Sequence, residues 1–222
     1  MDRLAALYGE PEPPLATDPF ERVLWENVGY LVDDERRRAV FERLRAEVGL
    51  TPEAILACPE ARLAAVTAEG GMLPEHRAGK LQAAAAILLE VGAERLRELL
   101  RTKPQEARKL LKRFPGIADP GADLLLLLAG AVPSLAPDSN ALRVLVRLGF
   151  SAADGDYSRQ YRTAARALAP QLPNDFAWLI RARELLRTHG QRLCRRTEPR
   201  CEPCPLSAGC RWYRDARGRV AS

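Results

Sequence analysis

The chain has 222 residues, of which 47% are hydrophobic and 28% charged, and its formal net charge is +5. This length suits one large domain or two smaller ones, and the composition is that of an ordinary globular protein. No apolar run approaches the roughly 20 residues that a membrane-spanning helix needs, so we expect no membrane association. The N-terminal residues, MDRLAALYGEPEPP, lack the apolar stretch of a signal peptide, which favours a cytoplasmic location.

Alanine, leucine, arginine and glutamate dominate the chain, and β-branched alternation is nearly absent. These residues favour helices, so the sequence predicts an all-α fold. Thr51 before Pro52 is typical of a helix start, with an N-cap threonine and proline at the first helical position. In chain order, the predicted helices span 19–32, 35–48, 51–57, 59–68, 75–92, 94–101, 104–113, 120–131, 138–148, 157–168, 174–188 and 205–212.

One connection between predicted helices stands apart, the stretch RFPGIADPGAD at 113–123. Its two Pro-Gly pairs predict a tight hairpin between a basic helix and the apolar segment Leu124–Val132. Asp119 before Pro120 is typical of an N-cap followed by the first helical residue. Glycines would let backbone amides approach an anion, and the second helix would add its positive dipole end. An ordinary helix–helix connection would give the same pattern.

Positive charge is concentrated at the C-terminal end of the chain. Residues 181–222 contain eleven arginines, no lysine and four acidic residues, which leaves the remaining residues slightly acidic. A basic module beside a near-neutral body suggests a polyanion partner, most simply a nucleic acid. By composition alone, a solvated arginine-rich surface explains the charge equally well.

Four cysteines lie in the same basic segment with the spacing C-x6-C-x2-C-x5-C: Cys194, Cys201, Cys204 and Cys210. The only other cysteine is Cys58, which we expect to be a small buried residue. Four thiolates at short spacings can bind a zinc ion or an iron–sulfur cluster. Two disulfides are the less favoured alternative, because they require an oxidising compartment.

Three features follow one another along the chain: Phe114-Pro115-Gly116-Ile117, then Pro137-Asp138-Ser139-Asn140, then the four cysteines. This order resembles the endonuclease III branch of the helix-hairpin-helix DNA glycosylases. The pattern of that family is Leu-Pro-Gly-Val-Gly, then Val-Asp-Thr-His, then the same cysteine spacing around a [4Fe–4S] cluster. The resemblance extends from about Pro19 to Cys210.

The resemblance implies a two-domain, all-α, helix-hairpin-helix glycosylase fold. A six-helix domain would span 21–133, with the helix-hairpin-helix motif at about 104–131. An iron–sulfur cluster domain would combine 1–20 with 134–222. The resemblance also implies a monomer that binds double-stranded DNA and flips the target nucleotide out of the base stack.

The resemblance assigns roles to individual residues. Asp138 matches the catalytic aspartate, whose carboxylate would stabilise positive charge on the sugar as the N-glycosidic bond breaks. Asp138 is equally well placed to cap the helix expected over 138–148, and both roles are compatible. The four cysteines would bind the [4Fe–4S] cluster. The implied DNA contacts come from the hairpin backbone and the loop after the first cysteine: Pro115, Gly116, Ala118, Arg195, Arg196 and Arg200.

Three hairpin residues depart from the family pattern. Pro120 occupies the position where bifunctional members carry the lysine that forms a Schiff base, and proline has no nucleophilic amine. Ala118 replaces the second glycine. Asp119 brings a negative charge to the expected phosphate site, where it would weaken the phosphate contact unless it caps the helix or helps hold a cation.

The helix that reads the substrate in the family also differs here. Leu31 falls near the glutamine that fills the gap left by the flipped base, and Tyr30 precedes it. An apolar wedge could fill a vacated stack, and a tyrosine ring could stack on a base. Alternatively, both residues belong to the core face of an amphipathic helix.

The function favoured by the sequence is base excision repair by a monofunctional DNA glycosylase. This enzyme would hydrolyse the N-glycosidic bond of a damaged or mispaired base without efficient lyase activity. One alternative is a catalytically weak or inactive DNA-binding member of the family. Another is a zinc-bearing nucleic-acid module without enzymatic function.

Overall fold

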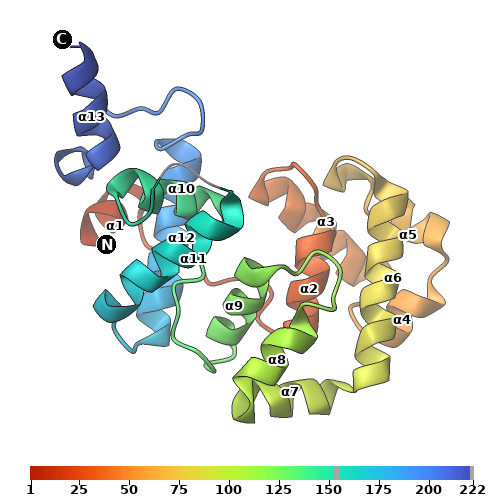
Figure 1. Cartoon of the computed structure of the whole chain (residues 1–222). Helices are drawn as coiled ribbons and strands as arrows, with labels where there is room; N and C mark the ends of the chain where they lie inside the picture. The colour runs from red at the N-terminus through yellow and green to blue at the C-terminus, as the bar shows by residue number, and fades with distance from the viewer. Residues whose placement is uncertain (153–155, 221–222) are drawn as a thin grey trace. The chain divides into compact units, whose positions relative to one another are not determined.

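The structure is a computed structural model that describes residues 1–152 and 156–220 (Figure 1). Its described residues form helices and no β-strand, which confirms the all-α prediction. None of the described helices is both long and apolar enough to cross a membrane. The chain divides into two compact units: unit 1 joins Met1–Pro13 with Val132–Ser222, and unit 2 is Pro14–Ala131.

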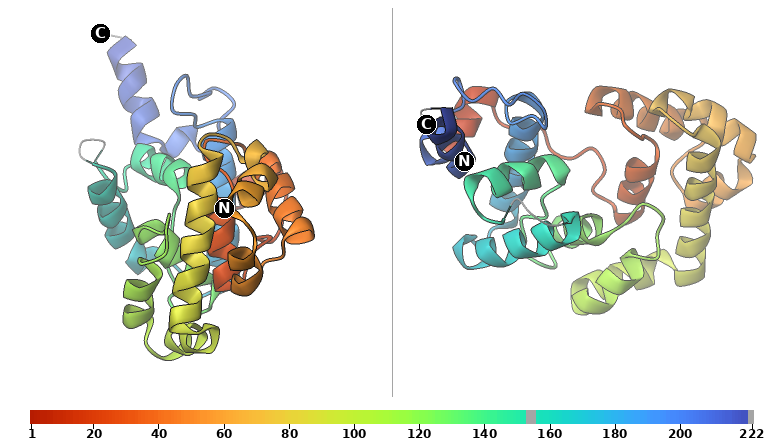
Figure 2. Two further views of the ribbon diagram at one scale, coloured as in Figure 1. Left: turned by 90° about the vertical axis from the view of Figure 1, so that its right-hand side faces the viewer. Right: turned by 45° about the horizontal axis from the view of Figure 1, so that its top comes forward.

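Unit 2 is built from consecutive helices around a leucine-rich and alanine-rich core. Its long central helix, α6, packs against α2, α4 and α5. Figure 2 shows the helices of unit 2 in two further views. The bounds are α2 (Pro19–Asn27), α3 (Asp34–Glu47), α4 (Pro52–Ala57), α5 (Glu60–Val66), η1 (Ala68–Gly70), α6 (Pro74–Val91), α7 (Ala93–Thr102), α8 (Pro104–Leu111) and α9 (Asp119–Leu128).

Unit 1 brings the two ends of the chain together. The N-terminal helix packs on α12, and α10 packs against α11, α12 and α13. Leu4, Leu145 and Leu185 are members of the shared core. The bounds are α1 (Asp2–Tyr8), α10 (Ser139–Leu148), α11 (Tyr157–Leu168), η2 (Ala169–Gln171), α12 (Phe176–Arg192), η3 (Ser207–Gly209) and α13 (Arg211–Val220).

Helices α10 and α12 approach each other very closely at Gly190. A Cβ atom on Gly190 would lie only 2.5 Å from the backbone oxygen of Asn140. Only glycine therefore allows the two backbones to approach this closely. This contact determines how the start of α10 and the end of α12 face each other, and both carry candidate site residues.

The structure corrects three predicted elements. The helix expected over 19–32 ends at Asn27, because the chain turns and the Tyr30 N–H donates to the Gly70 carbonyl at 2.7 Å. The prediction of one helix over 205–212 is wrong. A 3₁₀ turn forms at Ser207–Gly209, and α13 begins after it at Arg211. Helix α1 was not predicted. It has no side-chain cap and is anchored by its buried Leu4.

The Leu4→Ala variant tests whether burial of α1 holds unit 1 together. Leu4 is completely buried in the unit 1 core, so we expect a loss of about 3 kcal/mol in the free energy of unfolding. Leu7→Ala is the matched control, because Leu7 lies on the same helix but is 46% exposed. We expect it to change stability by less than about 1 kcal/mol. Equal effects in denaturant titrations would show that α1 is not docked through Leu4.

Candidate functional site

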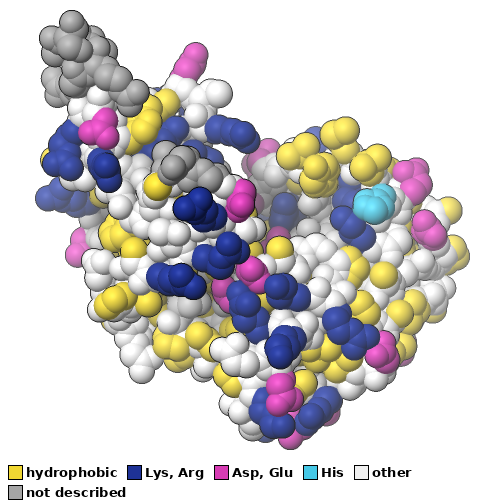
Figure 3. Space-filling model, in the orientation of Figure 1, with side chains coloured by type: hydrophobic (Ala, Val, Ile, Leu, Met, Phe, Trp, Pro, Cys, Tyr) yellow, Lys and Arg dark blue, Asp and Glu magenta, His cyan; other side chains and the backbone are white. Residues whose placement is uncertain are grey.

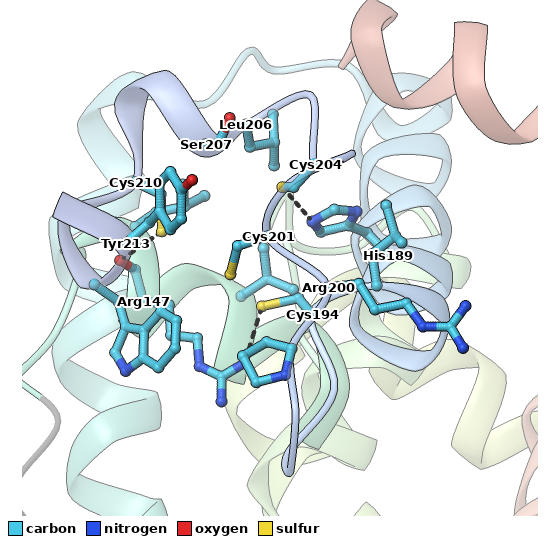
Figure 4. Close-up of a pocket in the computed structure, with 15 residues that line it drawn as sticks. Arg147, His189, Cys194, Arg200, Cys201, Cys204, Leu206, Ser207, Cys210 and Tyr213 are labelled. Carbon is cyan, nitrogen blue, oxygen red and sulfur yellow. Dashed lines mark hydrogen bonds between the residues drawn. The ribbon is translucent and has the colours of Figure 1, made fainter. Parts of the chain in front are cut away.

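The four C-terminal cysteines line a single pocket in unit 1 (Figure 4). All five cysteines of the chain are free thiols, and Cys58 is buried as expected. Apolar and aromatic side chains from α10, α12 and α13 complete the pocket, among them Val144, Leu193 and Trp212. The spacing that suggested a common ligand therefore corresponds to a common pocket.

Within the described part of the chain, no three Cys, His, Asp or Glu side chains converge on the position of one metal ion. Figure 4 shows the four sulfur atoms distributed around the pocket. A zinc ion needs its ligand sulfurs about 2.3 Å from one point. A [4Fe–4S] cluster takes four thiolates at separate iron corners. Four cysteine sulfurs around one pocket are a donor set that suits a [4Fe–4S] cluster.

Burial and mutual repulsion disfavour bare thiolates in this pocket. The pKa values of Cys201 and Cys204 are raised, first by burial and then by the charges of neighbouring cysteines. A backbone hydrogen bond from Leu206 partly opposes the shift at Cys204. Cys201 and Cys204 are therefore favoured as neutral thiols when nothing is bound between the cysteines.

Two arginines of α10 bind the segment that carries the first cysteine. Arg143 donates to the carbonyls of Cys194 at 2.8 Å and Gly190 at 2.7 Å. Arg147 donates to the carbonyl of Arg195 at 2.7 Å and lies 3.3 Å from the Cys194 sulfur. Burial lowers the pKa of Arg143, and the nearby Cys194 charge partly offsets the shift. The cysteine segment is therefore anchored to α10.

The buried imidazole of His189 lies between the pocket and helix α1. Its Nε2 atom is 3.5 Å from the Cys204 sulfur, and its Nδ1 atom is 2.9 Å from the Tyr8 hydroxyl. Burial lowers the pKa of His189 to about 4, so the ring is neutral at physiological pH. His189 therefore forms part of the lining of the cysteine pocket.

Asp138 is the N-cap of α10. One carboxylate oxygen accepts from the amides of Asn140 at 3.0 Å and Ala141 at 2.8 Å. The other accepts from Arg187 Nε at 3.0 Å, and both side chains of this ion pair are about one quarter exposed. The predicted cap is confirmed, and the carboxylate is held in one orientation while part of it still faces solvent.

The sequence reasoning missed two residues beside Asp138. Arg187 comes from α12 and had no local pattern that linked it to an aspartate 49 residues earlier. Tyr157 begins α11, is 42% exposed and stacks on Tyr161. Burial and the Asp138 charge raise the pKa of Tyr157 to about 12, so its phenol keeps its proton. Tyr157 therefore presents an exposed aromatic ring and a protonated hydroxyl.

In unit 2, helices α8 and α9 are joined by a tight turn. Phe114 and Ile117 are buried, whereas Gly116 and Ala118 are exposed. Gly116 has a φ of +77°, which favours glycine. The buried amide of Asn27 donates to the Pro115 carbonyl at 2.8 Å and fixes the turn against α2. These contacts hold the turn between α8 and α9 in one conformation.

Asp119 does not cap α9, contrary to the sequence expectation. The N-cap is Ala118, which has no side-chain hydrogen bond, and Asp119 is the first helical residue. Its carboxylate instead pairs with Lys112 at 2.7 Å and Arg108 at 3.2 Å. Arg108 of α8 and Lys112, which directly follows α8, both form ion pairs with the Asp119 carboxylate. Its negative charge is therefore largely compensated within the hairpin.

Tyr30 and Leu31 are neither helical nor part of the core, so the core alternative for these residues is wrong. Leu31 is 77% exposed and has a φ of +58°. Two further apolar side chains from the facing turn, Met72 and Leu73, are also exposed. A bridge between Tyr30 and Gly71 joins the two turns. Figure 3 shows hydrophobic side chains gathered near the start of α6.

Buried Arg77 of α6 holds the second of these turns. Its guanidinium donates to the carbonyls of Met72 and Thr67. Burial lowers its pKa, consistent with a cation enclosed by backbone rather than by water. The four residues Tyr30, Leu31, Met72 and Leu73 form what we call the apolar tip. Met72 and Leu73 were missed because nothing in the sequence pairs the two turns.

The predicted DNA-contacting arginines lie in the loop between the first two cysteines. Arg196 and Arg200 are exposed, and Arg195 is partly buried. The backbone carbonyls of Arg195 and Arg196 accept hydrogen bonds from Arg147, which turns the loop outward from α10. Unit 1 thus contains Asp138, the cysteine pocket and these arginines, whereas the hairpin and the apolar tip belong to unit 2.

Sequence comparison identifies relatives named endonuclease III. The Thermotoga maritima protein is 27% identical over 198 residues, covering 89% of this chain and 85% of the relative. The Treponema pallidum protein is 29% identical over 164 residues, covering 74% and 70%. No protein-family model matches the chain.

Structure comparison gives the same fold. A trapped endonuclease III–DNA covalent intermediate aligns with a TM-score of 0.75 and 23% identity, covering 97% of this chain and 94% of that one. A thermostable thymine-DNA glycosylase aligns with a TM-score of 0.73 and 18% identity, covering 96% and 94%. The fold is therefore that of the helical DNA glycosylases. In sequence and in fold, the chain is endonuclease III-like.

The Gly190→Ala variant tests whether the close helix contact organises the unit 1 site. The added methyl group would meet the Asn140 carbonyl, so we expect a loss of at least about 2 kcal/mol in unfolding free energy. Gly209→Ala is the control, because a Cβ there meets nothing within 4 Å. Denaturant titration measures both. An unchanged Gly190→Ala protein would contradict the packing described for α10 and α12.

Proposed function

We propose that the chain is a DNA glycosylase of base excision repair that hydrolyses the N-glycosidic bond of a damaged or mispaired base. The observation that carries this proposal is Asp138, an oriented and partly exposed carboxylate at the position of the family's catalytic aspartate. The endonuclease III names of its sequence relatives support the same class of reaction.

Asp138 would act on the sugar of the flipped nucleotide. Breaking the glycosidic bond leaves positive charge on the sugar, and a fixed carboxylate stabilises that charge without having to reorganise. The α10 amides and Arg187 orient the two carboxylate oxygens. The partly exposed face of Asp138 can also accept a proton from an attacking water molecule, which would complete hydrolysis.

The same hydrogen bonds favour one alternative, a DNA-binding protein with little catalytic activity. Asp138 already caps α10 and pairs with Arg187, so its carboxylate has a complete structural role. In that case the helix cap would explain the residue by itself. The two functions differ in whether base release depends on this carboxylate.

The hairpin lacks an amine at the position from which a Schiff-base lyase step starts in bifunctional members of the family. Pro120 lies in the first turn of α9 at the family's lysine position. The nearby Lys112 has its ammonium group 2.7 Å from the Asp119 carboxylate, with which it forms an ion pair. We therefore propose a monofunctional enzyme.

A [4Fe–4S] cluster would be held by Cys194, Cys201, Cys204 and Cys210. When bound, the cluster would supply positive charge that offsets part of the negative charge of the four thiolates, and it would fix the loop between them. Arg196 and Arg200 on that loop would then contact phosphates of double-stranded DNA. Exposed backbone at Gly116 and Ala118 would contact a further phosphate, and the apolar tip would occupy the space vacated by the flipped base.

The Asp138→Asn variant separates catalysis from helix capping. Asparagine remains a good N-cap, so we expect normal stability but at least a 100-fold lower rate of base release. Asp175→Asn is the matched control, because Asp175 caps α12 through the Trp178 amide in the same way. Single-turnover release is measured over a panel of lesion and mismatch duplexes. Equal rates for wild type and Asp138→Asn, or no release by either, would favour the binding protein.

Borohydride trapping on abasic DNA tests the absence of a lyase nucleophile. With proline at the hairpin position, we expect no covalent adduct from the wild-type protein. A Pro120→Lys variant places an amine at the matched position and should yield trapped complex. Strong trapping of the wild-type protein would contradict the monofunctional assignment.

A further inference from the structure

We propose that Tyr8, His189 and Cys204 form a hydrogen-bond relay through which the N-terminal helix positions a cluster-binding thiolate. The proposal rests on the [4Fe–4S] site suggested above and assigns a role to two residues outside the cysteine motif. The relay joins three separate parts of unit 1: helix α1, helix α12 and the cysteine segment.

The geometry is continuous from hydroxyl to sulfur. The Tyr8 oxygen lies 2.9 Å from Nδ1 of His189, and Nε2 of the same ring lies 3.5 Å from the Cys204 sulfur. The imidazole is only 1% exposed, so water cannot replace either partner without opening the unit. Figure 4 shows the ring of His189 directed at Cys204.

The chemistry of the thiolate determines the direction of the relay. A neutral imidazole carries one N–H, which lies on either Nδ1 or Nε2. Once Cys204 binds iron it has no S–H, so the sulfur can only accept a hydrogen bond. The N–H must then be on Nε2, and Nδ1 must accept a hydrogen bond from the Tyr8 hydroxyl. Tyr8 therefore selects the tautomer of His189 that donates to the thiolate.

The surroundings of Tyr8 keep its proton in place. Tyr8 is partly buried, and a phenol in such surroundings keeps its proton at neutral pH. The Arg192 guanidinium lies 5.7 Å from the centre of the Tyr8 ring, and Leu4 anchors the same helix in the core. The hydroxyl thus remains a donor in a fixed position. Hydrogen bonds to cluster sulfurs stabilise the thiolate and influence the reduction potential.

Tyr8→Phe removes the hydroxyl and leaves the ring in place. We expect the cluster to be lost to a chelator about fivefold faster than from wild type, and its reduction potential to fall. Tyr213→Phe is the matched control, because Tyr213 lines the same pocket but its hydroxyl donates to Glu202. Equal cluster loss for Tyr8→Phe and wild type would overturn the relay.

A second variant distinguishes the relay from simple packing. In His189→Gln, the side-chain amide can donate to Cys204 without help from Tyr8. Adding Tyr8→Phe to this variant should therefore have no further effect on cluster loss. The same fivefold effect in both backgrounds would show that Tyr8 acts only through packing.

If His189→Gln does not load a cluster, the comparison of Tyr8→Phe with Tyr213→Phe decides whether the relay exists. Iron analysis of the wild type comes first, since its absence would overturn the cluster proposal itself.

Discussion

The close contact of α10 with α12 at Gly190 is the constraint on which the rest of unit 1 depends. Because Gly190 has no side chain, the α12 backbone reaches the Asn140 carbonyl at the start of α10. Arg187, one turn earlier on α12, then meets the carboxylate of Asp138. Arg143, one turn further along α10, reaches the carbonyls of Gly190 and Cys194. One helix pair therefore positions both the candidate catalytic carboxylate and the cysteine pocket.

Many of the arginines that make the C-terminal segment basic form hydrogen bonds or ion pairs within the protein. Several of its arginines are engaged within the protein: Arg183 donates to the Ala136 carbonyl, Arg187 to Asp138, and Arg181 to Glu10. These side chains build unit 1 rather than present charge to a partner. Arg196 and Arg200 remain exposed on the cysteine loop. The charge relevant to DNA is thus smaller and more localised than the sum over the segment suggests.

Motifs with local chemistry could be predicted from the sequence, and contacts between distant segments could not. The all-α fold, the turn at Gly116, the Asp138 cap and the common cysteine pocket each depend on residues close together in the chain. Helix α1 escaped prediction because it is short, and its stability comes from burying Leu4 in a core built 130 residues later. Arg187 was missed for the same reason, as were Met72 and Leu73 of the apolar tip, whose turn lies about 40 residues after Tyr30 and Leu31.

Asp119 illustrates a local rule overridden by its neighbours. An aspartate before a proline usually caps a helix, but here two cations on α8 lie within ion-pair distance. The pairing draws the carboxylate toward α8 and leaves Ala118 at the cap position. The hairpin thereby keeps its shape while the negative charge of Asp119 is compensated.

The central claim is that the cysteine pocket holds a [4Fe–4S] cluster, which links unit 1 to the chemistry of the endonuclease III family. Iron, zinc and acid-labile sulfide measured on purified protein test it most directly. The account predicts iron and sulfide in equal amounts, about four of each per chain, and no stoichiometric zinc. One zinc per chain without sulfide would contradict it.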